Sequence, residues 1–387
     1  MLQRDGRALS DPTAVFLSWR GRWSDSPRAI SAELLRRGSP IRQVWVLDPD
    51  AEQGPPPDVV RVAPGSSEER EALADARWVV SNDTLELDWP KGPDCFYLQT
   101  WHGTPLKRIG WDVAWPPFSG ALHHYAVELP RDVAKVDAML SPNPYSTGVL
   151  RRSFRFDGPM LETGYPRADV LHGPGRHALR ARVRRALGLA EDTQAVLYAP
   201  TWRDTLQHTL GALDLDLLRR TLGPGTTVLL RAHGYTVASD RGGHGPGVRN
   251  VTRWPDIAEL ILAADVVVTD YSSSMFDVAG TGTPLLFHTW DLERYRDEIR
   301  GFTFDLAAEA PGPLLRTSAQ VAEALADVQA ARAPYRAAYA AFAARYCPWD
   351  DGGASARVVD AVFGAAAQEP GPPGEGTRRT DRGHARA

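Results

Sequence analysis

A run of serines after a predicted buried strand is the part of the sequence with the clearest chemical capacity. Residues 264–278 read ADVVVTDYSSSMFDV. The β-branched run predicts a parallel strand that ends at Asp270, and helical spacing resumes after Ser274. The first N–H groups of a helix lack partners within the helix and its dipole is positive there, so Ser272 and Ser273 are predicted to bind a phosphate or diphosphate. The simpler interpretation is that one of these serines only caps the helix.

Three other predicted strands also end in polar or charged residues. The predicted strand at 95–100 is followed by His102, Thr104, Lys107 and Arg108. The strand at 195–199 is followed by Arg203, and the strand at 226–231 ends at Arg231 and is followed by His233. In open α/β sheets, ligands bind beyond the carboxyl ends of the strands, so these residues could line one site with Asp270. A neutral imidazole is suited to take a proton from a hydroxyl group, and arginines are suited to hold phosphate. A single histidine is more often structural, but two of them at strand ends in different halves favour a functional role.

Several common catalytic and metal-binding motifs are missing from the sequence. It contains no G-x-G-x-x-G after a strand, no Walker A sequence and no H-E-x-x-H. A Rossmann dehydrogenase and a P-loop kinase are therefore not predicted. The two cysteines, Cys95 and Cys347, lie in no metal-ligand spacing, so we predict neither a disulfide framework nor a metal site. The sequence requires no cofactor, and it is compatible with Mg²⁺.

Strands alternate with helices along most of the chain, in two similar halves. Predicted strands lie at 14–18, 41–47, 59–62, 77–81, 95–100 and 137–141 in the first half, and at 195–199, 226–231, 248–251, 265–269 and 284–287 in the second. This order predicts an α/β protein with parallel sheets covered on both faces. We expect a first domain over residues 1–175 and a second over 176–365. Residues 366–387, rich in Pro, Gly and Arg, are expected to be a disordered tail.

A basic helix is predicted at the start of the second half. Residues 176–187, RHALRARVRRAL, place Leu179, Val183 and Leu187 on one face and arginines on the rest. Two interpretations are open for this helix. It meets an anionic membrane surface or an anionic substrate, or it is a solvated linker.

The composition is that of an ordinary globular protein. The chain has 387 residues, of which 43% are hydrophobic and 24% charged, and its net charge is −4. This length suits about two domains, and this charge predicts no nucleic-acid partner. The N-terminus lacks the apolar core of a signal peptide, and no run reaches the ~20 apolar residues of a membrane span. We therefore expect a cytoplasmic protein whose contact with the cell membrane is peripheral.

Taken together, six segments resemble one family, the CDP-glycerol glycerophosphotransferases of teichoic acid synthesis. They are SDSPRAI (24–30), QTWHGTPLKRIG (99–110), SPNPYSTGVL (141–150), ETGYPRADVL (162–171), LYAPTWRD (197–204) and a long run over 265–314, in the order of the family. The resemblance implies a GT-B-like fold, in which two Rossmann-like domains face each other across a cleft. It also implies a transferase that moves glycerol phosphate, or a similar polyol phosphate, from a CDP-activated donor to an acceptor hydroxyl group and releases CMP.

The resemblance further implies roles for individual residues. His102 would be the base on the acceptor hydroxyl group, and His233 would contact the diphosphate of the donor. The donor side would also comprise Arg203, Arg231, Asp270, Ser272, Ser273 and Arg300, and the acceptor side Thr104, Lys107 and Arg108. The family commonly has proline after the second histidine, whereas this chain has Gly234, a departure that bears on how His233 is held.

The implied partners are the CDP-polyol donor, a lipid-linked polyol-phosphate or disaccharide acceptor, and the inner face of the cell membrane. A primase, a polymerase and a ribitol-phosphate transferase are all compatible with these segments. Two other functions also stay open. One is a nucleotide-sugar glycosyltransferase on the same fold, and the other is a nucleotide-binding protein without catalysis.

Overall fold

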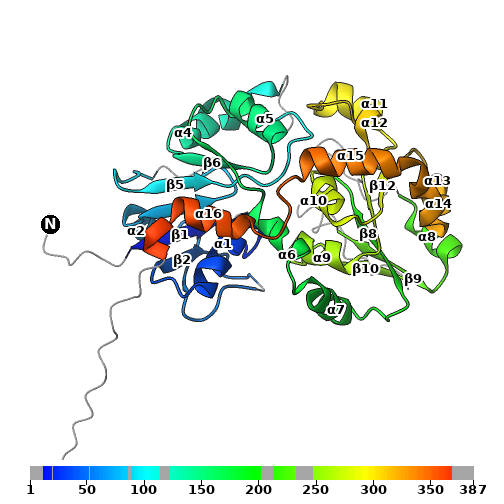
Figure 1. Cartoon of the computed structure of the whole chain (residues 1–387), viewed down its shortest axis with the longest axis horizontal. Coiled ribbons are helices and arrows are strands. Elements are labelled where there is room, and N and C mark those ends of the chain that lie inside the picture. Colours follow the sequence, from blue (N-terminus) through cyan, green and yellow to red (C-terminus); the bar gives the residue numbers. More distant parts are fainter. Residues whose placement is uncertain are drawn as a thin grey trace, which may run out of the picture.

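The computed structural model describes residues 12–19, 21–51, 53–85, 89–113, 123–201, 213–231 and 247–367. Within these ranges the chain forms two lobes, each built around one parallel sheet (Figure 1). Helices cover both faces of each sheet, so alternate residues of a strand pack into hydrophobic cores on opposite sides. In the first strand, Ala14 and Phe16 pack on one face, and Val15 and Leu17 pack on the other. The predicted α/β class with two Rossmann-like halves is confirmed.

The first sheet has seven parallel strands among the described residues, in the order β3-β2-β1-β4-β5-β6-β7. They are β1 (Thr13–Leu17), β2 (Arg42–Val46), β3 (Val60–Val62), β4 (Trp78–Ser81), β5 (Phe96–Gln99), β6 (Ala138–Ser141) and β7 (Met160–Glu162). The helices of this part are α1 (Asp25–Arg36), α2 (Ser67–Ala74), α4 (Leu129–Val133) and α5 (Pro144–Phe154). The predicted strands correspond to β1–β6, and β7 is an addition.

The second sheet has six parallel strands among the described residues, in the order β10-β9-β8-β11-β12-β13. They are β8 (Gln194–Ala199), β9 (Thr226–Leu230), β10 (Val248–Asn250), β11 (Val266–Thr269), β12 (Leu285–His288) and β13 (Leu314–Leu315). The helices that follow the first lobe are α6 (Asp169–His172), α7 (Arg176–Ala186), α8 (Leu215–Leu222), α9 (Ile257–Ala263), α10 (Ser274–Thr281), α11 (Leu292–Arg294), α12 (Leu306–Glu309), α13 (Ser318–Ala326), α14 (Val328–Arg332) and α15 (Arg336–Tyr346).

The last helix, α16 (Ala354–Val362), returns to the first lobe (Figure 1). Val358 and Val359 are fully buried in the same core as Ile30 of α1. The predicted domain limits stay a prediction. Because of this packing, we propose that residues 354–365 belong to the first domain and not to the second.

The strand order reverses once in each sheet, and this positions the candidate site. The reversal lies between β1 and β4 in the first sheet and between β8 and β11 in the second. Ligands of such sheets bind outside the carboxyl ends of the strands at this point, because the loops there diverge to opposite faces. The serines follow β11, and His102 follows β5, which is the neighbour of β4.

Candidate active site

His102 lies at the carboxyl edge of the first sheet, just after β5 ends at Gln99. Its Nδ1 lies 2.7 Å from the backbone carbonyl oxygen of Asn82, which follows β4. A carbonyl oxygen only accepts, so Nδ1 carries the proton and, in the neutral ring, Nε2 has the lone pair. The imidazole also packs against Trp101 and Trp19, with ring centres 3.9 Å and 4.4 Å away. These contacts fix the ring and its tautomer, which suits Nε2 to act as a base.

Burial lowers the pKa of His102 below its ordinary value. The negative charges of Asp83 and Asp25 and the bond to Asn82 act in the opposite direction, and the positive charge of Arg167 adds to the lowering. The net direction favours the neutral imidazole at pH 7, the form that can accept a proton.

The backbone around His102 is strained. Among the described residues, four that are not glycine have positive φ, and three of them surround this histidine: Trp19 (42°), Asp25 (61°) and Trp101 (52°). Left-handed backbone costs such residues about 1–2 kcal/mol each, and strain of this kind concentrates at functional sites. A hydrogen bond of 3.1 Å from the indole Nε1 of Trp19 to Asp25 Oδ2 holds two of these residues together.

The predicted phosphate site forms at the start of α10, directly after β11. Ser273 is the N-cap residue of α10, but its side chain makes no capping hydrogen bond. Ser272 Oγ accepts hydrogen bonds from the backbone N–H of Ser274, at 3.3 Å, and from the hydroxyl of Ser274, at 3.0 Å. The capping interpretation therefore fits Ser272 and not Ser273.

The two lobes touch where the histidine and the serines were expected to meet. Gly103 has a φ of +149°, and a Cβ atom at this glycine would lie 2.8 Å from Ser273 Oγ and 3.0 Å from Ser273 Cβ. These distances leave no room for a side chain, so the loop of His102 lies directly against the loop of the serines. The structure thus brings Gly103, the residue after His102, against Ser273.

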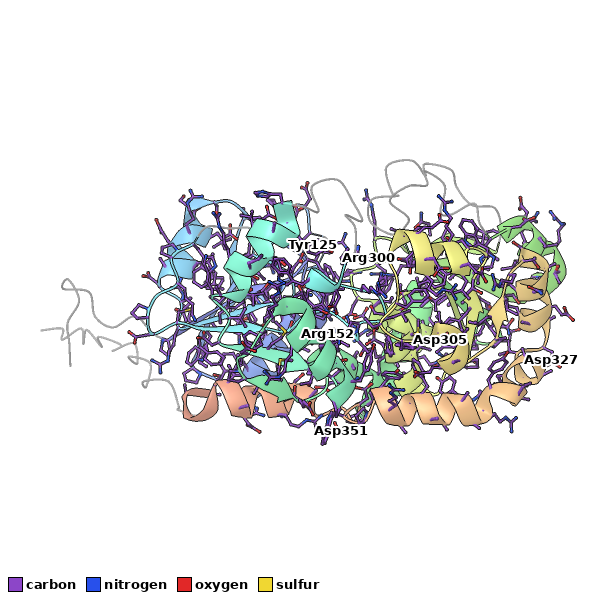
Figure 2. The ribbon with its side chains drawn as sticks, turned by 90° about the horizontal axis from the view of Figure 1, so that it is seen from above. Tyr125, Arg152, Arg300, Asp305, Asp327 and Asp351 are labelled. Atoms are coloured by element: carbon purple, nitrogen blue, oxygen red, sulfur yellow. The ribbon has the colours of Figure 1, made fainter. Side chains whose placement is uncertain are left out.

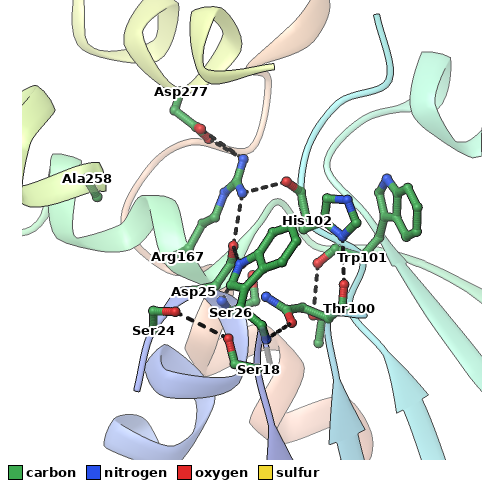
Figure 3. Close-up of polar contacts among 12 residues, drawn as sticks. Ser18, Ser24, Asp25, Ser26, Thr100, Trp101, His102, Arg167, Ala258 and Asp277 are labelled. Atoms are coloured by element: carbon green, nitrogen blue, oxygen red, sulfur yellow. Dashed lines mark hydrogen bonds and ion pairs between the residues drawn. The ribbon is translucent and has the colours of Figure 1, made fainter. Parts of the chain in front are cut away.

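Arg167, which was not among the predicted site residues, joins the loop of His102 to helix α10 (Figure 3). It lies in a 3₁₀ turn, η3 (Pro166–Ala168), between β7 and α6. One terminal nitrogen donates to the carbonyl oxygen of His102 at 2.6 Å and to Asp25 Oδ2 at 3.1 Å. The other donates to both carboxylate oxygens of Asp277, at 3.0 Å and 2.8 Å. Asp277 belongs to α10, so one guanidinium joins the histidine loop to the helix that the serines begin.

The segments that hold these two partners were visible in the sequence. Asp25 lies in SDSPRAI and Arg167 in ETGYPRADVL, both among the segments of the family resemblance. Nothing in their spacing indicated that they meet, because 142 positions separate them along the chain.

Asp270 and Arg231 lie at strand ends of the second sheet, as predicted. Asp270 is buried, and its Oδ1 accepts from the backbone N–H groups of Thr201, at 2.8 Å, and Tyr271, at 2.5 Å. This carboxylate therefore joins the loops that follow β8 and β11. Arg231 donates to the carbonyl oxygen of Trp254 at 2.6 Å, and burial lowers its pKa to about 10. Arg231 therefore remains positively charged at neutral pH.

A backbone contact joins the loop after His102 to the second lobe. We call residues 105–108 together with 300–303 the interlobe strap. Lys107 forms an isolated antiparallel bridge with Phe302. The strap has two further backbone hydrogen bonds, Arg108 N–H to the Gly301 oxygen at 3.2 Å and Thr303 N–H to the Leu106 oxygen at 2.8 Å. The strap holds the two lobes together close to the candidate site.

Arg300, predicted on the donor side, contacts the acceptor-side loop. Its Nε donates to the carbonyl oxygen of Arg108 at 3.1 Å, and a terminal nitrogen lies 3.3 Å from the hydroxyl of Tyr125 (Figure 2). Of the other residues predicted on the acceptor side, Thr104 is buried and Lys107 is half-buried, while Arg108 is exposed. The roles of these residues stay predictions.

Two predicted donor-side residues, His233 and Arg203, lie outside the described residues. Their predicted contacts with the donor therefore stay predictions, as does the effect of Gly234.

The basic helix α7 uses two of its arginines inside the protein. Arg180 donates to the carbonyl oxygen of Ala264 at 2.8 Å and to Asp265 Oδ1 at 2.6 Å. Arg184 is buried and donates to the carbonyl oxygens of Ala263, at 2.9 Å, and Thr193, at 2.6 Å. The bonds to Ala263 and Ala264 satisfy carbonyl groups at the end of α9. Together these bonds explain part of the basic face without a membrane or a substrate.

The described part of the chain shows neither a metal centre nor a membrane span. It contains no group of three or more His, Cys, Asp or Glu residues placed to hold a metal ion. None of its helices combines the length and the apolar composition needed to cross a bilayer.

Comparison with known proteins identifies the family of the chain. Residues 3–364 match the family of CDP-Glycerol:Poly(glycerophosphate) glycerophosphotransferase. The chain belongs to this family. A teichoic acid glycerol-phosphate transferase of Staphylococcus aureus is 34% identical over 90% of this chain and 92% of its own length. A solved structure of the wall teichoic acid polymerase TagF, 32% identical, superimposes with a TM-score of 0.84 over 92% of this chain and 89% of that chain. The predicted family and GT-B-like fold are confirmed.

The relatives differ in length. A teichoic acid poly(glycerol phosphate) polymerase of Bacillus subtilis is 37% identical over 91% of this chain, yet the match spans 49% of that relative. The chain thus spans about half the length of this family member and nearly all of the Staphylococcus aureus member.

Proposed function

We propose that the protein transfers glycerol phosphate from CDP-glycerol to a hydroxyl group of a teichoic acid acceptor and releases CMP. The observation that carries this proposal is the contact of the His102 loop with the serine loop. Gly103, the residue after His102, lies against Ser273, and this supports a neutral imidazole working near the N-terminus of α10, the part of the fold best suited to a diphosphate. The names of the relatives support glycerol as the polyol.

The proposed mechanism needs positioning and charge more than covalent help. The start of α10, with Ser272–Ser274, is the phosphate cradle in this proposal. An acceptor oxygen attacks the phosphorus of the glycerol phosphate in line with the leaving CMP, and the phosphorus–oxygen bond to CMP breaks as the new one forms. His102 Nε2 takes the proton from the acceptor hydroxyl group. The backbone N–H groups of the cradle stabilise the charge on the transferred phosphate.

The remaining residues complete the donor and acceptor sides. We propose that His233 and Arg203 contact the donor phosphates, together with Arg231. Asp270 is proposed to act by fixing the loops after β8 and β11, since its Oδ1 accepts two backbone N–H bonds. Lys107 and Arg108 lie beside the acceptor path in this proposal, and Arg300 supports them through the Arg108 carbonyl.

The test is CMP release from CDP-glycerol with a lipid-linked glycerol-phosphate acceptor. CDP-ribitol and UDP-sugars are assayed in parallel, and release with one of these alone would reassign the donor. His102→Ala is expected to lower turnover at least ~100-fold, the scale of losing a general base, while donor binding measured by calorimetry survives. Unchanged turnover in His102→Ala would remove this histidine from the mechanism.

We further propose that the protein works at a membrane surface, where a lipid-linked acceptor would reside. Arg176, Arg182 and Arg185 of α7 are exposed, in contrast to the inward Arg180 and Arg184, and they supply positive charge for anionic headgroups. Sedimentation with vesicles that contain anionic lipid tests this location. Binding that Arg182→Glu with Arg185→Glu does not weaken would rule out this face of α7.

A further inference from the structure

We propose that Arg167 is a positioning residue for the transfer reaction, whose guanidinium sets the distance and orientation between His102 and the phosphate cradle. The inference rests on the proposed function, because it concerns the base and the donor site of that reaction. It assigns a role to a side chain that contacts neither substrate in the mechanism above.

The bonds of Arg167 reach all the parts that must be aligned. They run to the carbonyl oxygen of His102, to Asp25 at the start of α1, and to both oxygens of Asp277 in α10 (Figure 3). The side chains of Arg167, Asp25 and Asp277 are only 9%, 7% and 10% exposed, so water does not substitute for these bonds. A guanidinium donates from a rigid planar fork, which fixes the angle between its partners as well as their distance.

Asp25 links the same guanidinium to the ring of His102 from a second direction. Its Oδ2 accepts from the indole of Trp19 at 3.1 Å, and Trp19 packs on the imidazole. Arg167 therefore acts on the histidine twice, once through its backbone carbonyl and once through the Asp25–Trp19 contact. A displacement of about 1 Å between reacting groups can lower a rate ~100-fold, so small errors in this alignment should be visible in turnover.

The charge of Arg167 has a separable effect. Asp277 lies in the first turn of α10, close to where the donor diphosphate would bind. Burial raises the pKa of Asp277, and the adjacent Arg167 opposes this rise. Loss of the positive charge would raise the pKa of Asp277 further, and it would remove a cation that favours the donor phosphates, so donor binding should weaken. Loss of the planar guanidinium with the positive charge retained would disturb only the alignment of His102 with the phosphate cradle.

Arg167→Lys is therefore the decisive variant, because lysine keeps the charge but makes no planar fork. We expect its kcat to fall roughly 10- to 100-fold while its Kd for CDP-glycerol, measured by calorimetry, stays near the wild-type value. Arg167→Met should lower kcat and also weaken donor binding. Wild-type kcat in Arg167→Lys would overturn the inference, and so would parallel loss of kcat and donor affinity in that variant.

Arg37→Lys is the matched control. Arg37 also bonds two carboxylates and a carbonyl group, those of Glu33, Asp360 and Ala356, but it joins α1 to α16 at the opposite end of α1. We expect Arg37→Lys to lower the unfolding temperature without a change in kcat. A fall in kcat equal to that of Arg167→Lys would mean that loosening the fold suffices, and the positioning role would be wrong.

Two further measurements keep the inference testable. Should the Arg167 variants fail to fold, Asp277→Asn is the alternative. It removes the negative charge of Asp277 and one of the two hydrogen bonds that this side chain accepts from Arg167. It should also lower kcat, and wild-type kcat in this variant would overturn the inference. An NMR signal of ¹³C-labelled His102 reports the ring environment without turnover, and it should move in Arg167→Lys and not in Arg37→Lys. Absence of CMP release by the wild type, with the signal moving as expected, would contradict the proposed function alone.

Discussion

His102 is held by groups from separate parts of the first lobe, and this determines what its ring can do. The carbonyl oxygen of Asn82 fixes the proton on Nδ1, and the indoles of Trp19 and Trp101 limit rotation of the ring. Burial favours the neutral form. The proposed base needs an unprotonated nitrogen and a fixed ring at working pH, and these contacts favour both.

The pH profile of kcat/KM should show this environment. Activity is expected to fall on the acid side as His102 becomes protonated, with an apparent pKa below its ordinary value of about 6.5. Asp83→Asn removes a negative charge that raises the pKa of His102, so the acid limb should move to lower pH. Asp25, which also raises this pKa, and Arg167, which lowers it, remain in place. Asp94→Asn, an exposed change on the same lobe, should leave the limb where it is.

Gly103 is predicted to be irreplaceable for activity. A methyl group at Gly103 would clash with Ser273 at 2.8 Å and push the histidine loop from the cradle, so Gly103→Ala should lower kcat/KM at least ~10-fold. Gly38→Ala is the control, because Gly38 has a φ of +65° and no atom within 4 Å of an added Cβ. That control should cost about 1 kcal/mol of stability and no activity. Equal activity of the two variants would contradict close contact of the loops.

At the scale of elements, the sequence allowed prediction of what depends on local pattern. The β-branched run before Asp270 and the spacing after Ser274 correctly predicted β11 and α10. The strand β13 has two residues, Leu314–Leu315, which is too short for a pattern. The Ala-rich stretch after Ser318 divides into three helices, α13, α14 and α15. The side chain of Asp327 caps the start of α14, and Pro334 lies in the 3₁₀ turn that separates α14 from α15.

The site was predictable in part for the same reason. His102 and the serines follow strands, and the carboxyl ends of strands are a fixed place in such folds. Arg167 lies in a turn between the lobes, and its partners come from α1 and α10. Such a contact depends on how two lobes pack, and no local periodicity records that packing.

The interlobe strap yields a prediction of its own. Thr303 Oγ1 donates to the carbonyl oxygen of Pro105 at 2.6 Å, and its hydroxyl lies 2.5 Å from that of Tyr145. Thr303→Val removes these bonds and should cost about 1–3 kcal/mol locally. Hydrogen exchange at the amides of Arg108 and Thr303 should become faster. Thr147→Val, which removes a hydroxyl bonded to Glu162 at an exposed site, should leave both amides protected.

At the scale of the whole molecule, the chain crosses between the lobes twice, and the crossings are joined. The first runs through η3 and α6, and the second follows α15 and leads into α16. Asp169 of α6 accepts hydrogen bonds from the backbone N–H groups of Ala354, at 2.9 Å, and Ser355, at 2.7 Å. This carboxylate caps the start of α16. It therefore joins the second crossing segment to the first, two residues after Arg167. The geometry between the lobes therefore depends on the docking of α16 as well as on the strap.

This arrangement predicts that damage to α16 unfolds the first lobe before the second. Val358 is fully buried in the core with Ile30 and Trp45, so Val358→Asp places a charge in an apolar interior and should cost more than ~4 kcal/mol. Hydrogen exchange should become faster in β1 and β2, while β8 and β11 keep their protection. Ala361→Asp adds the same charge on the exposed face of α16 and should change neither lobe. If Val358→Asp instead exposed the second sheet first, α16 would belong with the second domain, and the Asp169 cap would be a link between domains and not within one.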